Sequence, residues 1–251
     1  GGAPRPEPWL SGVQRRILKR CHRVFYPTRF SADAWLARGL LREEQVAMCM
    51  EVSSVFEAAD RAAARLRTGM SGHPVFVWNA GLNARKDPLT AIRGFSLIRT
   101  TWPHAKLYMI YLTSEMLGEV QAAIAADPVL AGAVEMRGRI PHTQVEDFLN
   151  SADFLLHSAR SEIGCFGVLE AMACGVIPVA TDIPLCRTVT RDGQYGILFP
   201  VGDHQSMAER TLQFDIDKIG LMSRSIRELF ARSFSYDAIA EIYEDAFLSG
   251  R

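Results

Sequence analysis

Two glutamates around a glycine-rich turn are the residues of this chain whose types and spacing best suit ligand chemistry. Glu162 and Glu170 lie eight residues apart within Arg160–Gly175, with Gly164 and Gly167 between them. Carboxylates accept hydrogen bonds from neighbouring hydroxyl groups, and glycines let the main chain approach a ligand closely. The free N–H groups at the start of a following helix would attract a phosphate. The segment therefore predicts a ligand site with two carboxylates beside an anion-binding main chain.

The residues on either side predict the elements that position this pair. Phe154–His157 predicts a short buried strand, and Val168–Cys174 predicts a helix that ends at Gly175. Glu162 then lies in the loop at the carboxyl end of the strand, whereas Glu170 lies in the first turns of the helix. Ligands of parallel sheets bind in the crevice outside the carboxyl ends of the strands, so this loop is the expected binding edge.

A second loop carries cations that suit a phosphate. In Asn79–Leu89, Asp87 is placed to cap a helix and Pro88 to occupy its first position. Lys86 then projects just before the positive end of that helix, where its flexible charge suits a diphosphate oxygen. The adjacent Arg85 would point to the opposite side of an extended loop. The alternative is that Lys86 and Arg85 are two solvated loop charges.

From residue 74 the chain alternates strand and helix patterns with short connections, which predicts an α/β fold with a doubly wound, mainly parallel sheet. Several strands are too apolar to have a wet face, as expected for a sheet covered on both sides. The predicted strands are residues 75–79, 106–112, 134–137, 154–157, 176–180 and 196–199. Two helical stretches, 203–232 and 235–249, follow them.

The N-terminal part predicts smaller elements and one basic segment. Strands are expected at 24–26 and 46–50, and a helix is expected between Ser31, as its N-cap, and Gly39. Residues 10–29 carry six Lys and Arg residues and no acid, and their apolar residues keep helical spacing. We expect a surface helix whose apolar stripe packs on its own sheet. The alternative is peripheral attachment to an anionic membrane surface.

Composition limits the possible classes of protein. The 251 residues are 48% hydrophobic, and 28 Lys and Arg balance 28 Asp and Glu, which is typical of a globular chain and gives no reason to expect a nucleic-acid partner. The five cysteines contain no C-x-x-C, so their spacing suggests neither a disulfide framework nor a zinc site. No apolar run is long enough to cross a bilayer, and a cytoplasmic location is expected.

The spacing Glu-x7-Glu lies within Ser-Glu-Ile-Gly-Cys-Phe-Gly-Val-Leu-Glu-Ala-Met-Ala-Cys-Gly-Val-Ile-Pro-Val, residues 161–179. This segment resembles the signature of retaining glycosyltransferases of the GT-B fold, family four. The resemblance covers roughly residue 74 to the C-terminus and is tightest over 161–203. It implies a Rossmann-like donor-binding domain in residues 74–232 and a C-terminal helix in 233–251 that crosses back to the other domain.

The resemblance also implies roles for individual residues. Glu162 would bind hydroxyls of the donor sugar, and Glu170 would bind the ribose hydroxyls of the nucleotide. In the family's Gly-Arg-Leu-x-x-x-Lys loop the Lys aligns with Lys86, but Gly81 stands where the Arg would be, so Arg85 is the candidate substitute. The remaining donor contacts, largely through the main chain, would come from Arg139, Ile140, Gly164, Cys165, Phe166, Gly167 and Val168.

The implied reaction moves a sugar from a UDP- or GDP-sugar to an acceptor hydroxyl with retention at the anomeric carbon, as in a hexosyltransferase. No metal and no other cofactor are expected. Residues 1–55 would be the end of an acceptor-binding domain and 56–73 a connector. Most of that domain would be absent, so the chain is expected to be a fragment or to need a partner in cis or trans. Alone it is expected to bind nucleotide but to turn over poorly.

Several alternatives stay open. The chain is either an enzyme or a non-catalytic nucleotide-sugar-binding or regulatory module, and an epimerase or phosphorylase on the same architecture is a third class. Glu162 and Glu170 could also be the paired carboxylates of a glycoside hydrolase, but these belong to one loop and its own helix rather than to opposite sides of a bond. His157 either borders the site or is structural. Cys165 is either reactive beside a helix start or packs in the core.

Overall fold

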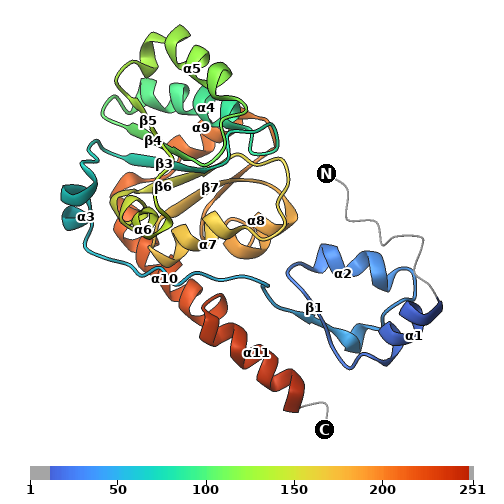
Figure 1. Cartoon of the computed structure of the whole chain (residues 1–251). Coiled ribbons are helices and arrows are strands. Elements are labelled where there is room, and N and C mark those ends of the chain that lie inside the picture. Colours follow the sequence, from blue (N-terminus) through green and yellow to red (C-terminus); the bar gives the residue numbers. More distant parts are fainter. Residues whose placement is uncertain (1–11, 249–251) are drawn as a thin grey trace.

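The computed structural model describes residues 12–248. The first two residues of the basic segment 10–29, the start of the predicted region 1–55 and the last residues of 233–251 lie outside the described part. Within it, the chain forms a large six-stranded sheet flanked by helices and a small two-stranded sheet near the N-terminus (Figure 1).

The large sheet confirms the predicted α/β class, and the boundaries of its strands differ from the predicted ones by about one residue. All of its strand pairs are parallel, and the order β5-β4-β3-β6-β7-β8 places β3 and β6, from which the chain winds in opposite directions, side by side at the centre. Its strands are β3 (Val75–Ala80), β4 (Lys106–Tyr111), β5 (Val134–Gly138), β6 (Phe154–His157), β7 (Ile177–Thr181) and β8 (Ile197–Phe199).

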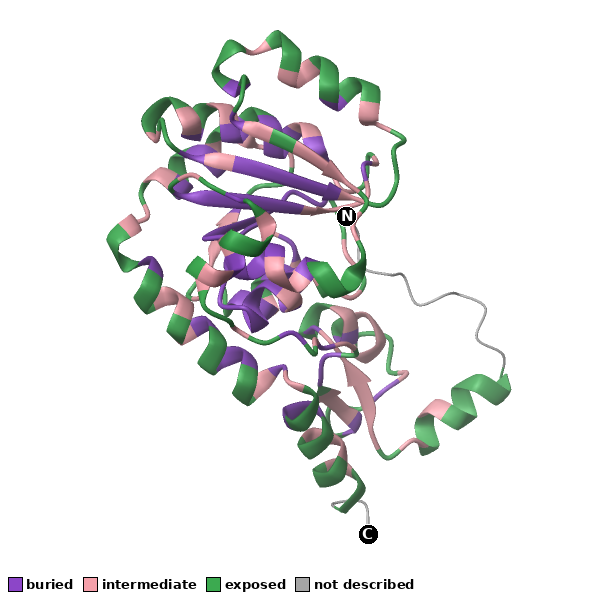
Figure 2. Ribbon diagram, turned by 60° about the vertical axis from the view of Figure 1, so that its left-hand side comes forward, coloured by how far each residue is buried: buried purple, intermediate pink, exposed green. Residues whose placement is uncertain are grey.

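Helices cover both faces of this sheet, which explains the apolar strand sequences. Figure 2 shows the central strands in the colour of buried residues, and all four residues of β6 are buried. On one face lie α4 (Pro88–Thr101), α5 (Leu117–Ala126) and α9 (His204–Leu212); on the other lie α6 (His142–Ser151), α7 (Phe166–Ala173), α8 (Pro184–Thr190) and α10 (Ile219–Ser233) (Figure 1). Short 3-10 turns, η2 (Pro128–Leu130) and η3 (Ile216–Lys218), complete the connections.

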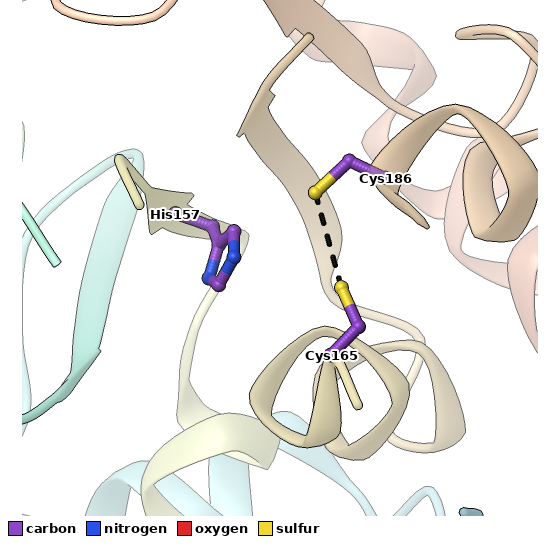
Figure 3. A group of neighbouring side chains, drawn as sticks. All are labelled: His157, Cys165 and Cys186. Carbon is purple, nitrogen blue, oxygen red and sulfur yellow. Dashed lines mark hydrogen bonds between the residues drawn. The ribbon is translucent and has the colours of Figure 1, made fainter. Parts of the chain in front are cut away.

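One polar group lies inside this core, where β6, α7 and α8 meet. The imidazole of His157 and the thiols of Cys165 and Cys186 converge there (Figure 3), and all three residues are buried. Apolar side chains make up most of the core, with Phe76 stacked on Phe154 at 5.0 Å between ring centroids.

The N-terminal part confirms the two predicted strands but corrects one helix boundary. β1 (Val24–Tyr26) pairs in parallel with β2 (Val46–Met48), with η1 (Glu43–Gln45) just before it. The helix α2 spans Arg29–Leu36, and Thr28, not Ser31, is its N-cap. The Thr28 hydroxyl accepts a hydrogen bond from the Ser31 main-chain N–H at 3.1 Å, so the hydroxyl that caps the helix lies three residues earlier than predicted.

The helix α1 (Gly12–Arg20) does not pack as predicted. It buries none of its residues, and Val13 and Ile17 are 66% and 57% exposed. The expectation that its apolar stripe packs on its own sheet is therefore wrong for the described chain. It is held at its C-terminal end instead, because Gln45 donates hydrogen bonds from Nε2 to the carbonyls of Leu18 and Cys21.

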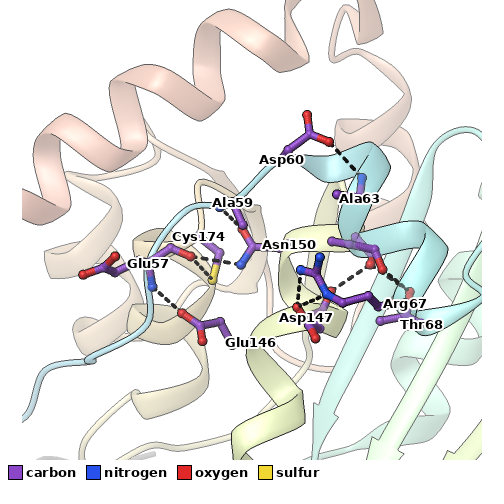
Figure 4. A network of polar contacts seen from close by, with 12 residues as sticks. Glu57, Ala59, Asp60, Ala63, Arg67, Thr68, Glu146, Asp147, Asn150 and Cys174 are labelled. Atoms are coloured by element: carbon purple, nitrogen blue, oxygen red, sulfur yellow. Dashed lines mark hydrogen bonds and ion pairs between the residues drawn. The ribbon is translucent and has the colours of Figure 1, made fainter.

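A connector runs along the large sheet and is helical in part, as predicted. Its extended half is held to α6: Asn150 accepts a hydrogen bond from the Ala59 N–H and donates one to the Glu57 carbonyl (Figure 4). Its helix α3 (Arg61–Thr68) begins at the N-cap Asp60 and pairs Arg67 with Asp147 at 2.6 Å. The Arg67 guanidinium lowers the pKa of the Asp147 carboxyl.

The C-terminal helix α11 (Tyr236–Leu248) contacts the N-terminal part. Tyr243 packs on Phe25 with 4.4 Å between ring centroids, and the Ser53 hydroxyl donates to the Phe234 carbonyl at 2.5 Å. None of the helices within residues 12–248 has both the length and the apolar character needed to cross a bilayer.

Candidate functional site

The loops after β3 and β6 meet at the carboxyl edge of the sheet, where the strand order reverses. Such a reversal opens a crevice for ligands in doubly wound folds. Hydrogen bonds join the two loops, because the Arg160 N–H donates to the Arg85 carbonyl at 2.8 Å and the Ser158 hydroxyl donates to the Lys86 carbonyl at 2.9 Å. The two predicted site segments therefore form one rigid edge.

Glu162 is the centre of the charged cluster at this edge. Its side chain is 6% exposed and forms an ion pair with Lys86 Nζ, and Arg85 Nη1 lies 3.4 Å from Glu162 Oε2. His157 Nε2 lies 3.2 Å from Glu162 Oε1, although it makes no hydrogen bond to the described residues. The sequence left His157 between a structural role and a place at the site, and the structure places it beside Glu162.

These contacts determine the charge of Glu162. Burial raises the pKa of this carboxyl, but the contacts with His157 and Lys86 outweigh burial and lower the pKa to about 2. Glu162 is therefore an anion at neutral pH. It is held in one position by neighbours from two segments, the β3–α4 loop and β6, which is what a group that accepts hydrogen bonds from ligand hydroxyls requires.

Arg85 and Lys86 point to the same side of their loop, which corrects the expectation that they diverge. The loop is a turn rather than an extended segment, because the N–H groups of Lys86 and Asp87 both donate to the Asn83 carbonyl, at 3.1 and 3.2 Å. Asn83 also accepts a hydrogen bond from the Lys86 N–H through its side-chain oxygen at 3.1 Å. Arg85 remains 49% exposed, so it can reach a ligand without leaving the protein surface.

Asp87 caps α4, as predicted. Its carboxylate accepts a hydrogen bond from the Thr90 N–H, its backbone has a left-handed φ of 48°, and Pro88 occupies the first turn of the helix. Arg160 Nη2 lies 2.9 Å from Asp87 Oδ2. The sequence did not indicate this pair, because Arg160 belongs to the other loop and nothing in the local sequence links the two residues.

The helix α7 begins at Phe166, two residues before the predicted start. Cys165 is its N-cap, with a left-handed φ of 55° and no side-chain hydrogen bond to the first turn. The first N–H groups of an α-helix have no partner within the helix, so they are available to an anion. Cys165 and Val168 are buried, so only their main chain could meet a ligand.

A pocket of about 660 Å³ lies beside this helix start, at the carboxyl ends of β3 and β4. Pockets for small ligands commonly have this size. The predicted donor-binding residues that line it are Gly81, Arg139, Ile140, Gly167 and Glu170. His142 completes one wall, and its Nε2 lies 2.8 Å from Glu170 Oε1. His142 was missing from the predicted site, although its position directly after the 138–141 loop was the available signal.

Glu162 and Glu170 line different pockets. Glu162 belongs to a smaller pocket of about 130 Å³ between the β6–α7 loop, the start of α8 and the N-terminal part, where Thr28, Phe30 and Ser31 form the opposite wall. The β6–α7 loop separates this pocket from the larger one. A ligand that uses both carboxylates must therefore lie along the edge of the sheet and pass the start of α7.

Gly81 lies in a crowded position on the floor of the larger pocket. A Cβ at Gly81 would be 2.8 Å from Thr113 Oγ1 and 2.9 Å from Asn83 Nδ2, so a larger side chain would displace both groups. Gly164 is also crowded, with the Phe166 ring 2.9 Å from such an added atom. Phe166, another of the predicted donor-binding residues, is 56% exposed at the start of α7.

Known proteins resemble this chain in sequence. Residues 119–226 match the family model described as Glycosyl transferases group 1. A D-inositol 3-phosphate glycosyltransferase of Catenulispora acidiphila is 26% identical over 210 residues, which cover 78% of this chain and 50% of that protein. A D-inositol 3-phosphate glycosyltransferase of Acidothermus cellulolyticus is 26% identical over 213 residues, which cover 79% of this chain and 47% of that protein. The chain therefore spans about half the length of these curated relatives.

Solved structures share the fold. Anabaena HepE in complex with UDP and glucose superposes with a TM-score of 0.74 at 17% identity, over 96% of this chain and 68% of its own. The C-terminal domain of a glycosyl transferase group 1 family protein from Francisella tularensis superposes with a TM-score of 0.66 at 16% identity, over 72% of this chain and 97% of its own.

Proposed function

The chain carries a glycosyl transferases group 1 domain of the GT-B fold, and from this premise we propose that it holds the nucleoside-diphosphate sugar of a retaining glycosyltransferase reaction. The observation that carries the proposal is the convergence of Lys86 and Glu162 beside the start of α7. Structural relatives crystallised with UDP and glucose support a UDP-sugar as the first donor to test.

In this proposal the donor lies along the edge of the sheet. The base and ribose occupy the larger pocket, where Arg139 and Ile140 border the base and Glu170 accepts hydrogen bonds from the ribose hydroxyls. The diphosphate lies against the starts of α4 and α7, next to Lys86. The sugar reaches Glu162, whose carboxylate is already charged and oriented.

The residues assist transfer by stabilising the leaving group. Negative charge develops on the departing diphosphate, and Lys86 together with the free N–H groups at the start of α7 would stabilise it. We assign no protein nucleophile. The acceptor hydroxyl attacks from the face that the diphosphate leaves, and its proton passes to the leaving phosphate. The proposed reaction therefore calls for no metal.

Calorimetry with UDP, UMP and GDP tests the binding part of this proposal. Lys86→Met is expected to weaken UDP binding by about tenfold. A charged hydrogen bond contributes about 1.5–3 kcal/mol, and part of this is offset because Lys86 must leave Glu162. UMP binding should change much less. The matched control is Lys218→Met, because Lys218 is an exposed lysine in η3. Equal UDP affinity for the wild type and Lys86→Met would refute the role of Lys86.

Product analysis separates the enzyme from a binding module. The chain is incubated with UDP-glucose and a panel of acceptor alcohols, alone and with any separately encoded acceptor domain. Formation of an α-linked product from the α-linked donor supports retaining transfer. Tight nucleotide binding without product under all conditions would instead favour a non-catalytic nucleotide-sugar-binding module.

The exposed Val13 and Ile17 of α1, next to its cations, support peripheral contact with an anionic membrane as a second property. Co-sedimentation with vesicles that contain increasing anionic lipid tests it. Binding that does not rise with anionic lipid, or that is unchanged in the double variant Val13→Ser, Ile17→Ser, would exclude this role for α1.

A further inference from the structure

We propose that His157, Cys165 and Cys186 form a binding site for a soft divalent cation, with Zn²⁺ as the best match. One ligand atom from each residue lies within 4.8 Å of the other two (Figure 3). This site is independent of the proposed transferase activity, because it is built from side chains that the donor does not need to touch.

The spacing of the two sulfur atoms suits tetrahedral coordination. Zinc binds thiolate sulfur at about 2.3 Å, so two thiolates on one tetrahedral zinc are about 3.8 Å apart. The Sγ atoms of Cys165 and Cys186 are 3.8 Å apart. The cation can therefore enter between them with little movement of α7 or α8, which carry them at a helix start and within a helix.

The histidine supplies the second observation. His157 is 6% exposed, and its Nε2 is buried without a hydrogen-bond partner in the described residues. A buried polar atom without a partner costs free energy. Nε2 faces Glu162, with 3.2 Å to Oε1, but makes no hydrogen bond to it, so a cation bound to the ring would give the imidazole a partner that the described residues do not supply. A carboxylate beside the imidazole is typical of histidines that bind zinc.

The charges of the bound site balance. A divalent cation and two thiolates sum to zero, so the complex can be buried without a net charge. The contact with Cys165 and burial both raise the pKa of the Cys186 thiol, which favours its protonated form before the cation binds. Each thiol therefore gives up its proton to solvent as its bond to the cation forms, and one bound Zn²⁺ replaces two protons.

The smaller pocket lies close to the cluster, and one position of the cation is left for a non-protein ligand. Two residues that line the pocket of about 130 Å³ are next to the cluster. Glu162 lies beside His157 in space, and Leu185 precedes Cys186 in the sequence. Three protein ligands leave the fourth position of the cation for water, as in zinc sites that keep an open position.

The burial of the pair disfavours the other chemistry that two adjacent thiols could have. Cys165 and Cys186 are 2% and 0% exposed, and thiols that react with soluble oxidants are exposed and have a lowered pKa. A redox disulfide is therefore the less suitable assignment. Plain core packing of two thiols is the alternative that the experiment must separate from a metal site.

Titration of the chelator-stripped, reduced protein with Co²⁺ tests the site, because tetrahedral thiolate ligation gives intense charge-transfer and ligand-field absorption. We expect saturation at one Co²⁺ per chain and loss of the bands on addition of Zn²⁺. Native mass spectrometry with Zn²⁺ should show one added zinc and the loss of two protons. Cys165→Ser and Cys186→Ser should abolish the charge-transfer band, and His157→Phe should weaken binding.

Cys49→Ser is the matched control, because Cys49 is a buried cysteine outside the cluster. It should bind Co²⁺ like the wild type. If folded wild-type protein shows no Co²⁺ bands, the proposal is overturned whatever the variants show. The two thiols and the histidine would then only pack in the core. Equal bands in the wild type, Cys165→Ser and Cys186→Ser would also overturn it. Nucleotide binding by the same samples is measured separately, so failure of the metal site and failure of the donor site remain distinguishable.

Discussion

Asp153 is the buried carboxylate on which the attachment of α3 to the large sheet depends, and its replacement gives the sharpest test of the structure. Its side chain is 3% exposed. Arg61 Nη1 lies 2.6 Å and Arg65 Nη2 3.0 Å from its two oxygens. The Val75 N–H at the start of β3 donates to it at 2.7 Å. Asp153→Asn keeps the shape of the side chain but replaces one accepting oxygen with a donor that faces these donors.

The expected loss follows from this geometry. Removal of one partner from a buried ion pair costs about 3–5 kcal/mol, because the remaining charge is left without compensation. Arg61 and Arg65 are 33% and 26% exposed, so both can turn partly to water. We therefore expect the lower end of the range, about 3 kcal/mol. For a chain of this size the midpoint of thermal unfolding should fall by about 6–12 °C.

Urea denaturation of Asp153→Asn is compared with that of Asp147→Asn, which is the matched control because Asp147 of α6 pairs with the same connector helix. Asp147 also pairs with an arginine of α3, but its side chain is 35% exposed and that of Arg67 is 51% exposed. An exposed pair contributes about 0.2–1 kcal/mol. If the two variants lose the same free energy of unfolding, burial does not determine the strength of these pairs and the reasoning is refuted.

Three further predictions follow from other contacts. In metal-free protein, the lowered pKa of Glu162 stabilises the fold by about 3 kcal/mol above about pH 4.5, and this stabilisation is lost as the pH falls toward 2. Urea denaturation of Glu162→Gln should therefore show a smaller dependence of the unfolding free energy on pH. The exposed control Glu228→Gln should keep the dependence of the wild type. Gly94→Ala places a Cβ 2.2 Å from Met207 Cε and 3.0 Å from the His204 carbonyl, so thermal unfolding should show a loss of about 1–3 kcal/mol. Gly81→Arg adds a cation to the lining of the larger pocket, and calorimetry should show UDP binding strengthened about tenfold. The thermal midpoint is measured beside it, because the new side chain must displace Thr113.

The fold could be predicted from the sequence because its signals are local. Apolar runs of strand length and helix punctuation such as Asp87–Pro88 and Gly175 lie within a few residues of the elements they define. The predictions were wrong at the start of α2, where two nearby hydroxyls compete to be the N-cap, and at α1, whose apolar stripe is not covered by the described residues. Thr28 and Ser31 both suit an N-cap, and only the backbone conformation separates them. The apolar stripe of α1 has the right period, but a period does not say what covers it.

The site could be predicted only in part, because its most informative contacts join distant segments. The sequence pattern placed Lys86 and Glu162 at the same edge, but it could not show that both loops fold so that Arg85 reaches the same carboxylate. Cysteine spacing likewise gave no metal signal, because the cluster takes its members from β6, α7 and α8 rather than from one short motif.

The charged cluster leaves Glu162 with a cation even when Lys86 turns to a phosphate. A diphosphate that draws Lys86 away from Glu162 would leave a buried carboxylate without its nearest cation, which is costly unless another group compensates. Arg85 and His157 lie 3.4 and 3.2 Å from that carboxylate and do not depend on Lys86 for their position. Glu162 therefore keeps Arg85 as a positive neighbour while Lys86 moves to the phosphate. If this exchange operates, Arg85→Met should weaken UDP binding even though Arg85 need not touch the nucleotide. Unchanged UDP affinity in Arg85→Met would mean that Lys86 serves the phosphate without leaving Glu162.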